Sequence, residues 1–269
     1  MPTSYRRCVR GGRCRSPVER PPSVNRRLLA QLSYGHFATD LSQGALPALL
    51  PLFKTQYHLS YTDVGIVVLM ANISSSVVQP AFGVLSDRLR MRWLMPAGAL
   101  IAGTGMMLAI AATNFAVMIG MIFICGLGVA AFHPEGYKFA GLASGARPAT
   151  GMSYFSLGGN LGYGLGPAAA SIALHFAGPR GMVYMPVFSI SAAILLWLAA
   201  SPGRRDRLES EWQAPAVPAA GAVPARIGGL AARTVLSLLV AFVILRSWVS
   251  VGESSFIPLY FTGVRHFYH

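Results

Sequence analysis

Seven stretches of this chain are dominated by apolar side chains, and polar or glycine-rich segments separate most of them. A helix needs about 20 mainly apolar residues to cross a bilayer, and each stretch is of that order. The stretches are residues 28–53, 62–82, 94–112, 115–132, 150–176, 183–200 and 234–261. The fifth is less apolar, but its glycines favour a closely packed helix over a loop. The pattern predicts an all-α membrane protein.

Two regions fall outside this pattern. Residues 1–27 contain eight Arg and four Pro without an apolar period, which predicts a basic disordered tail. Residues 201–233 are polar and then rich in Pro, Ala and Gly, and they are long for a connection between adjacent helices. We therefore expect a six-helix unit over 28–200, a cytoplasmic linker over 201–233, and over 234–269 the first helix of a second unit.

Composition agrees with a membrane protein. Only 12% of the 269 residues are charged and 54% are hydrophobic, whereas a soluble domain carries about 25% charged residues. The net charge of +13 lies mainly in alternate connections, where 18 of the 22 Lys and Arg are found. By the positive-inside rule these connections and the N-terminus are cytoplasmic. The expected partner of the charge is therefore the lipid bilayer rather than nucleic acid.

Sequence motifs for other chemistries are missing. There is no CxxC or HxxxH pair for a metal and no glycine-rich phosphate loop before Lys54. We weighed His36, Asp40, His133 and Glu135 as metal ligands and rejected them, because no pair has the usual spacing along the chain. The sequence predicts no metal, no cofactor and no enzyme.

Polar residues recur with helical spacing in the first, second and seventh stretches. At i, i+4 and i+7 they share one face of a helix, and burying an ionisable group in a membrane costs about 3 kcal/mol or more. Such faces are expected to line a bundle interior or a wet path for substrate. The triplets are His36, Asp40 and Gln43; Asn72, Ser76 and Gln79; and Arg246, Ser250 and Glu253.

Roles follow from these residue types. Asp40 is a candidate for binding and releasing a proton, and His36, one turn away, could share it. The alternative is that Asp40 only joins helices by hydrogen bonds. Arg246 could hold an anionic substrate group, or it could pair with Glu253. We expect Asn160 of the fifth stretch to bond to a neighbouring helix.

His133 and Glu135 flank Pro134 near the end of the fourth stretch. Proline disfavours helix for the residue before it, so this segment predicts a fixed helix end. We interpreted both side chains as structural rather than as part of proton coupling.

Two glycine-containing motifs add specificity. The turn after the second stretch contains Gly83, Asp87, Arg88 and Arg92, and the fifth stretch contains Gly158, Gly162, Gly166 and Pro167. Small residues at i, i+4 and i+8 allow close helix packing. These two elements resemble the cytoplasmic gating loop and the helix-five antiporter motif of the major facilitator superfamily.

Further motifs resemble the fosmidomycin-resistance branch of that superfamily. They are Phe132–Gly136, Ala143–Gly145, Gly158–Gly162 and Leu165–Pro167. The resemblance implies a proton-coupled antiporter in a bacterial inner membrane that exports a small drug-like molecule and confers antibiotic resistance. It also implies twelve helices in two halves, of which this chain would contain the first half and one more helix.

An alternative interpretation is a truncated or frameshifted fragment that does not transport. A second half, or self-association of this chain, would then be needed to complete the bundle.

Overall fold

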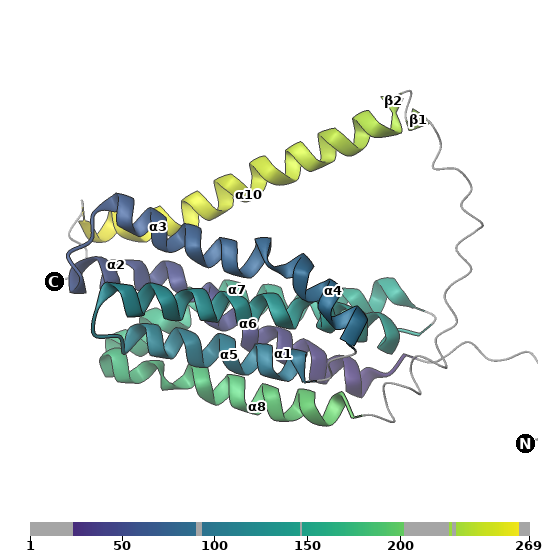
Figure 1. Ribbon diagram of the computed structural model, residues 1–269, viewed down its shortest axis with the longest axis horizontal. Helices are drawn as coiled ribbons and strands as arrows, with labels where there is room; N and C mark the ends of the chain where they lie inside the picture. Colours follow the sequence, from purple (N-terminus) through teal and green to yellow (C-terminus); the bar gives the residue numbers. More distant parts are fainter. Residues whose placement is uncertain (1–23, 90–92, 146, 202–225, 228–229, 264–269) are drawn as a thin grey trace, which may run out of the picture.

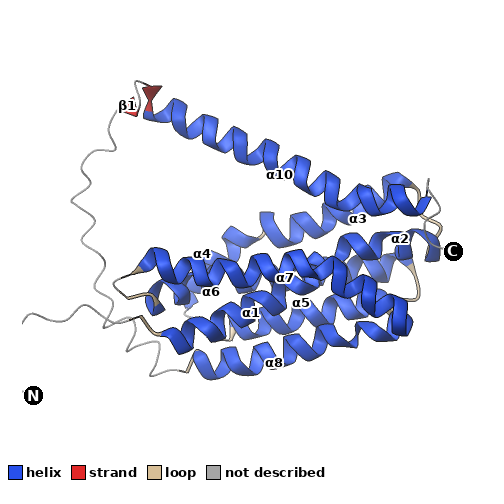
Figure 2. Ribbon diagram, turned by 180° about the vertical axis from the view of Figure 1, so that it is seen from behind, coloured by secondary structure: helices blue, strands red, loops and turns tan. Residues whose placement is uncertain are grey.

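The computed structural model describes residues 24–89, 93–145, 147–201, 226–227 and 230–263, and these are almost entirely helical (Figures 1 and 2). The first two passes along the bundle are α1 (Arg26–Gly44) with α2 (Leu46–Gln56), and α3 (Tyr61–Asn72) with the π-helix η1 (Ile73–Val77) and α4 (Gln79–Leu89). The next are α5 (Leu94–Ile110), α6 (Phe115–Ala143) and α7 (Pro148–Ala177). The 3-10 helix η2 (Gly178–Val183) then leads into α8 (Tyr184–Ala199), and α10 is Ala232–Gly263.

The predicted all-α membrane fold is confirmed. All seven predicted stretches lie on these helices, although the first divides at Ala45 and the second contains the π-turn. Within the described residues, four helical runs are long and apolar enough to cross a membrane, and one of them, Pro148–Ala199, contains both α7 and α8. Inside the predicted linker, β1 (Arg226–Ile227) and β2 (Leu230–Ala231) form a short antiparallel pair. The predicted tail over 1–27 lies almost wholly outside the described residues.

Local signals explain where several helices begin. The Asn25 side chain accepts a hydrogen bond from the Leu28 amide and starts α1, and Asn114 does the same for Val117 in α6. Ser60 starts α3 through a reciprocal capping box. These caps satisfy amides that have no partner within the helix.

Successive passes run in opposite directions through the bundle (Figure 1). The apolar core consists of two clusters. One contains Leu32, Phe132 and Phe155 and lies near the start of α1. The other contains Leu49 and Phe53 and lies along α2. The middle of α1, which carries the polar residues, lies between them.

Helix α10 is the least enclosed element. The most apolar stretch of this helix has no buried residues, although Ser255 and Leu259 near the end of the helix are buried. Figure 1 shows it diverging from the bundle at its start and approaching α2 and α3 at its end. Most of its surface therefore faces outward from the described part of the chain.

Candidate functional site: a His–Asp–His cluster inside the helix bundle

Helix α1 places His36 and Asp40 on one face. His36 lies ten residues after Arg26, which at 1.5 Å per residue is about 15 Å along the helix axis. His36 is 3% exposed. Its Nε2 lies 3.2 Å from Oδ2 of Asp40.

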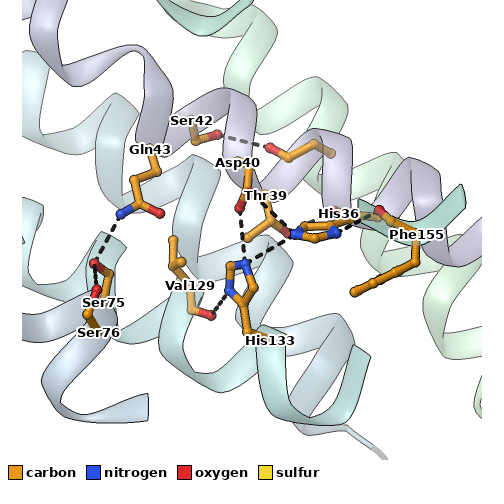
Figure 3. A network of polar contacts seen from close by, with 12 residues as sticks. His36, Thr39, Asp40, Ser42, Gln43, Ser75, Ser76, Val129, His133 and Phe155 are labelled. Atoms are coloured by element: carbon orange, nitrogen blue, oxygen red, sulfur yellow. Dashed lines mark hydrogen bonds and ion pairs between the residues drawn. The ribbon is translucent and has the colours of Figure 1, made fainter. Parts of the chain in front are cut away.

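Helix α6 brings His133 to the same point. Nε2 of His133 lies 3.2 Å from Nε2 of His36 and 3.5 Å from Oδ1 of Asp40 (Figure 3). We call His36, Asp40 and His133 the proton cluster. The sequence analysis separated His133 from the other two, and the fold brings all three together.

The prediction of a helix end at Pro134 is wrong. Helix α6 continues through this proline to Ala143. Within a bilayer core unpaired backbone groups are costly, so a membrane segment remains helical past a proline when its neighbours support it. His133 therefore projects from the interior of a long helix rather than from a loop. Glu135 is fully buried and accepts a hydrogen bond from Ser86 of α4.

Backbone carbonyls orient both imidazoles. Nδ1 of His36 lies 2.9 Å from the carbonyl oxygen of Phe155, and Nδ1 of His133 lies 2.8 Å from that of Val129. The His36 ring also stacks on the Phe155 ring at a centroid distance of 4.2 Å. The two Nε2 atoms are consequently aimed at each other and at Asp40.

Gly159 leaves the space that the His36 ring occupies. A Cβ atom at Gly159 would lie 2.5 Å from Cε1 and 2.7 Å from Cδ2 of His36, which is closer than carbon atoms approach. Glycine is therefore required here for packing. The sequence analysis did not select Gly159, although it falls within one of the quoted motifs.

The glycine stripe of α7 lies against the backbone of α1. Cβ atoms at Gly158, Gly162 and Gly166 would collide with the backbone at Ser33, Phe37 and the Gly44–Ala45 junction. Pro167 lies inside α7 without ending it. The close approach of α1 and α7 holds the His36 face next to Phe155.

Gln43 continues the polar face of α1 and bonds to the π-helix η1. Its Nε2 donates to Oγ of Ser75 at 3.0 Å. The regular spacing of Asn72, Ser76 and Gln79 assumed an α-helix throughout, whereas η1 has the wider π geometry. Asn72 instead donates to the carbonyl of Val68 in its own helix at 2.8 Å.

Other predicted path residues lie on open surface. Ser76, Asn160, Arg246 and Glu253 are exposed, and Gln79 is partly buried. Among the described residues no ion pair joins Arg246 to Glu253. Their roles remain predictions.

The predicted gating loop lies at the end of the bundle where α4 meets α6. Asp87 accepts a hydrogen bond from Nζ of Lys138 at 2.9 Å. A Cβ atom at Gly83 would lie 3.7 Å from Cβ of Pro134, which is ordinary contact. Arg88 is exposed in the last turn of α4, and Arg92 lies outside the described residues.

The proton cluster also has a geometry that could hold a metal ion. One ligand atom from each of the three side chains lies within 4.8 Å of the others. The expectation that no metal site exists considered spacing along the chain only, and it missed this convergence of α1 and α6. The same three atoms are also suited to holding a proton. A measurement of the metal content of the protein distinguishes a bound metal ion from a bound proton.

Comparison with known proteins identifies the family. The chain is 29% identical over 169 residues to the fosmidomycin resistance protein of Escherichia coli (strain K12), covering 63% of this chain and 42% of that protein. It is 28% identical over 179 residues to an uncharacterized MFS-type transporter of Bacillus subtilis (strain 168), covering 66% and 44% respectively. The chain thus spans less than half the length of these relatives. The model of the Major Facilitator Superfamily matches residues 32–268, and the chain belongs to that superfamily.

Proposed function

We propose that this chain supplies the first half of a proton-coupled secondary transporter that exports a small, anionic, drug-like compound. The observation that carries the proposal is the proton cluster. It brings together a buried imidazole, a partly buried carboxyl group and a second, partly buried imidazole inside the helix bundle. Ionisable groups inside a membrane-embedded bundle are costly and are typical of proton and substrate pathways.

The substrate class is suggested by a relative. The Escherichia coli protein is named for resistance to fosmidomycin, which is a phosphonate. An exposed guanidinium at Arg246 of α10 suits such an anion, because its fork geometry binds phosphonate oxygens in pairs. In this proposal Gln43, Asn72, Ser76, Gln79, Asn160 and Glu253 line the same path.

The orientation in the membrane is inferred from charge. The start of α1, the end of α4 and the start of α7 lie at one end of the bundle and the end of α2 lies at the other (Figure 1). Arg26, Arg88 and Arg147 belong to the first end, and Lys54 belongs to the last turn of α2. The positive-inside rule places the richer end in the cytoplasm of a bacterial inner membrane. Export against a proton entering from outside then requires Asp40 and His36 to face the two sides alternately.

The loop at that end is proposed to act as the gate. Gly83, Asp87, Arg88 and Arg92 would contact the second half when the cytoplasmic side is closed. In superfamily members the two halves rock around a site near the midplane.

Transport can be tested in inverted membrane vesicles. Residues 1–263 would be continued by the part of the Escherichia coli relative that follows the first helix of its second half, and uptake of radiolabelled fosmidomycin would be measured with and without a pH gradient. We expect uptake that a protonophore abolishes and that Asp40→Asn eliminates. The control Asp63→Asn, at an exposed helix start, should retain it.

Each result bears on a separate part of the proposal. Uptake that does not depend on the pH gradient would refute proton coupling. Full uptake by Asp40→Asn would remove Asp40 from the mechanism. No uptake above that of empty vesicles, in a protein that is present in the membrane, would refute transport of this substrate.

A further inference from the structure

The hydrogen-bond partners of His36 and His133 determine which ring nitrogens carry protons. A backbone carbonyl only accepts hydrogen bonds, so Nδ1 of His36, facing Phe155, and Nδ1 of His133, facing Val129, must both be protonated. A neutral imidazole has one N–H group. Both Nε2 atoms therefore present lone pairs toward the centre of the cluster when the rings are neutral.

Those lone pairs cannot face each other without a proton between them. The two Nε2 atoms are 3.2 Å apart, and the carboxylate of Asp40 lies 3.2 Å from one and 3.5 Å from the other. Three acceptors at these distances repel. A single added proton, held between Nε2 of His36 and Nε2 of His133, replaces the repulsion across that contact with a charge-assisted hydrogen bond, and the positive charge it brings attracts the carboxylate of Asp40.

The same proton balances the charge. Two neutral imidazoles and one carboxylate carry a net charge of −1, and one proton makes the cluster neutral. Buried net charge is expensive, so both hydrogen bonding and charge favour the singly protonated state.

Resting on the proton-coupled function proposed above, we propose that His133 is the third member of the proton site: one proton is shared among Nε2 of His36, Nε2 of His133 and the Asp40 carboxylate, and this proton joins α1 to α6. His133 is thus a proton-binding residue rather than a structural one. The positions of the protons on Nδ1 are fixed by Phe155 and Val129, which keeps the shared proton at the centre.

The surroundings contain no group that would replace this proton among the described residues. The titratable groups that face the cluster are Tyr137 on α6 and Tyr163 on α7, and each interacts electrostatically with Asp40. Phenol hydroxyls are uncharged at neutral pH. Glu135 and Lys138, on the same helix as His133, contact Ser86 and Asp87 of α4.

Release of the proton would loosen the joint between α1 and α6. Without it the Nε2 atoms of His36 and His133 and the carboxylate of Asp40 repel one another, and this polar link between the two helices is lost while their apolar contacts remain. Proton release and separation of α1 from α6 are therefore coupled events. This supplies a physical connection between protonation and rearrangement of the helices.

The test uses the 269-residue chain itself, purified in lipid nanodiscs with ¹⁵N-labelled histidine. Nuclear magnetic resonance of the imidazole nitrogens reports the protonation of each ring as pH is varied, and single His→Asn variants assign the signals. His58 and His175 lie elsewhere in the structure and serve as internal references. Metal content is measured on the same samples.

We expect Nδ1 of both His36 and His133 to be protonated, and both residues to follow one common titration curve, because interacting sites titrate as a unit. The variant His133→Asn keeps an amide donor for the Val129 carbonyl but has no counterpart of Nε2. It should change the titration curve of His36 and leave that of His58 unchanged. In the vesicle assay it should lose uptake as Asp40→Asn does.

A second variant alters the geometry without removing a titratable group. Gly159→Ala would displace the His36 ring and should separate the curves of His36 and His133. Its matched control is Gly164→Ala, because a Cβ atom there meets nothing within 4 Å.

Three results would overturn the inference. Independent titration of His133, a protonated Nε2 with an unprotonated Nδ1 on either residue, or one tightly bound metal ion per chain would each do so. These outcomes are separate from transport. If uptake is proton-coupled but His133 titrates independently, the proposed function stands and the inference about His133 fails. If the proton is shared but uptake does not depend on the pH gradient, the inference about the cluster stands and the proposed function fails.

Discussion

The contact between α1 and α7 makes a sharp prediction about glycine. A Cβ atom at Gly162 would collide with the carbonyl of Phe37 and would lie 3.0 Å from the amide nitrogen of Leu41. Both obstacles are backbone atoms, so no side chain can rotate to make room. The substitution Gly162→Ala must therefore push the two helices apart.

The loss of stability caused by Gly162→Ala is best measured against the same substitution at a matched position. Gly164 lies on the same helix, and a Cβ atom there meets nothing within 4 Å. Both substitutions gain the helix preference of Ala over Gly, which is worth about 1 kcal/mol. Only Gly162→Ala adds the cost of overpacking, about 1–3 kcal/mol. We expect Gly162→Ala to be less stable than Gly164→Ala by that amount.

The assay is unfolding in mixed micelles of increasing sodium dodecyl sulfate content, followed by circular dichroism. The difference in unfolding free energy between the two variants is the measured quantity, since the helix preference cancels. Equal stability of the two variants would refute the close approach of α1 and α7. It would also remove the support that this contact gives to the position of His36.

Two smaller effects are expected from other residues. Asn114→Ala removes the cap that accepts a 2.9 Å hydrogen bond from the Val117 amide at the start of α6, and it should lower the unfolding free energy by about 1 kcal/mol. Asn114→Asp keeps an acceptor and should not lower it. An equal loss of stability in both variants would contradict the capping role. Lys138→Gln removes the ion pair with Asp87, and the Asp87 side chain is 71% exposed. In the same unfolding assay this substitution should therefore change stability by less than about 1 kcal/mol. A larger change that survives high salt would show that this pair is not screened by solvent.

The order and extent of the helices could be predicted because membrane-spanning segments are specified locally. Their length and apolar character are visible in consecutive residues. The glycine spacing of α7 was similarly visible, and Gly158 and Gly162 do lie against α1. In both cases one helix contains the whole signal.

The proton cluster could be predicted only in part. His36 and Asp40 are four residues apart on one helix, so their proximity follows from helical geometry. His133 is 97 residues from His36 in the sequence, and only the packing of α6 on α1 brings them together. The proline after His133 was a misleading signal, because the rule for helix ends in water applies less strictly inside a bilayer.

The π-turn of the second membrane pass determines where this chain can change its length. In η1 the amide of Val78 bonds to the carbonyl of Ile73, five residues earlier, so the turn holds one residue more than an α-helix would. Losing one residue between Ile73 and Val77 would leave an ordinary helix, with Val67 on one side and Ser86 on the other still facing inward. The same loss within α3 or α4 would rotate everything beyond it by about 100° and turn a buried face toward lipid. The loss of a single residue is therefore expected to be tolerated within this one turn, while the lengths of its two flanking segments are fixed by what they pack against.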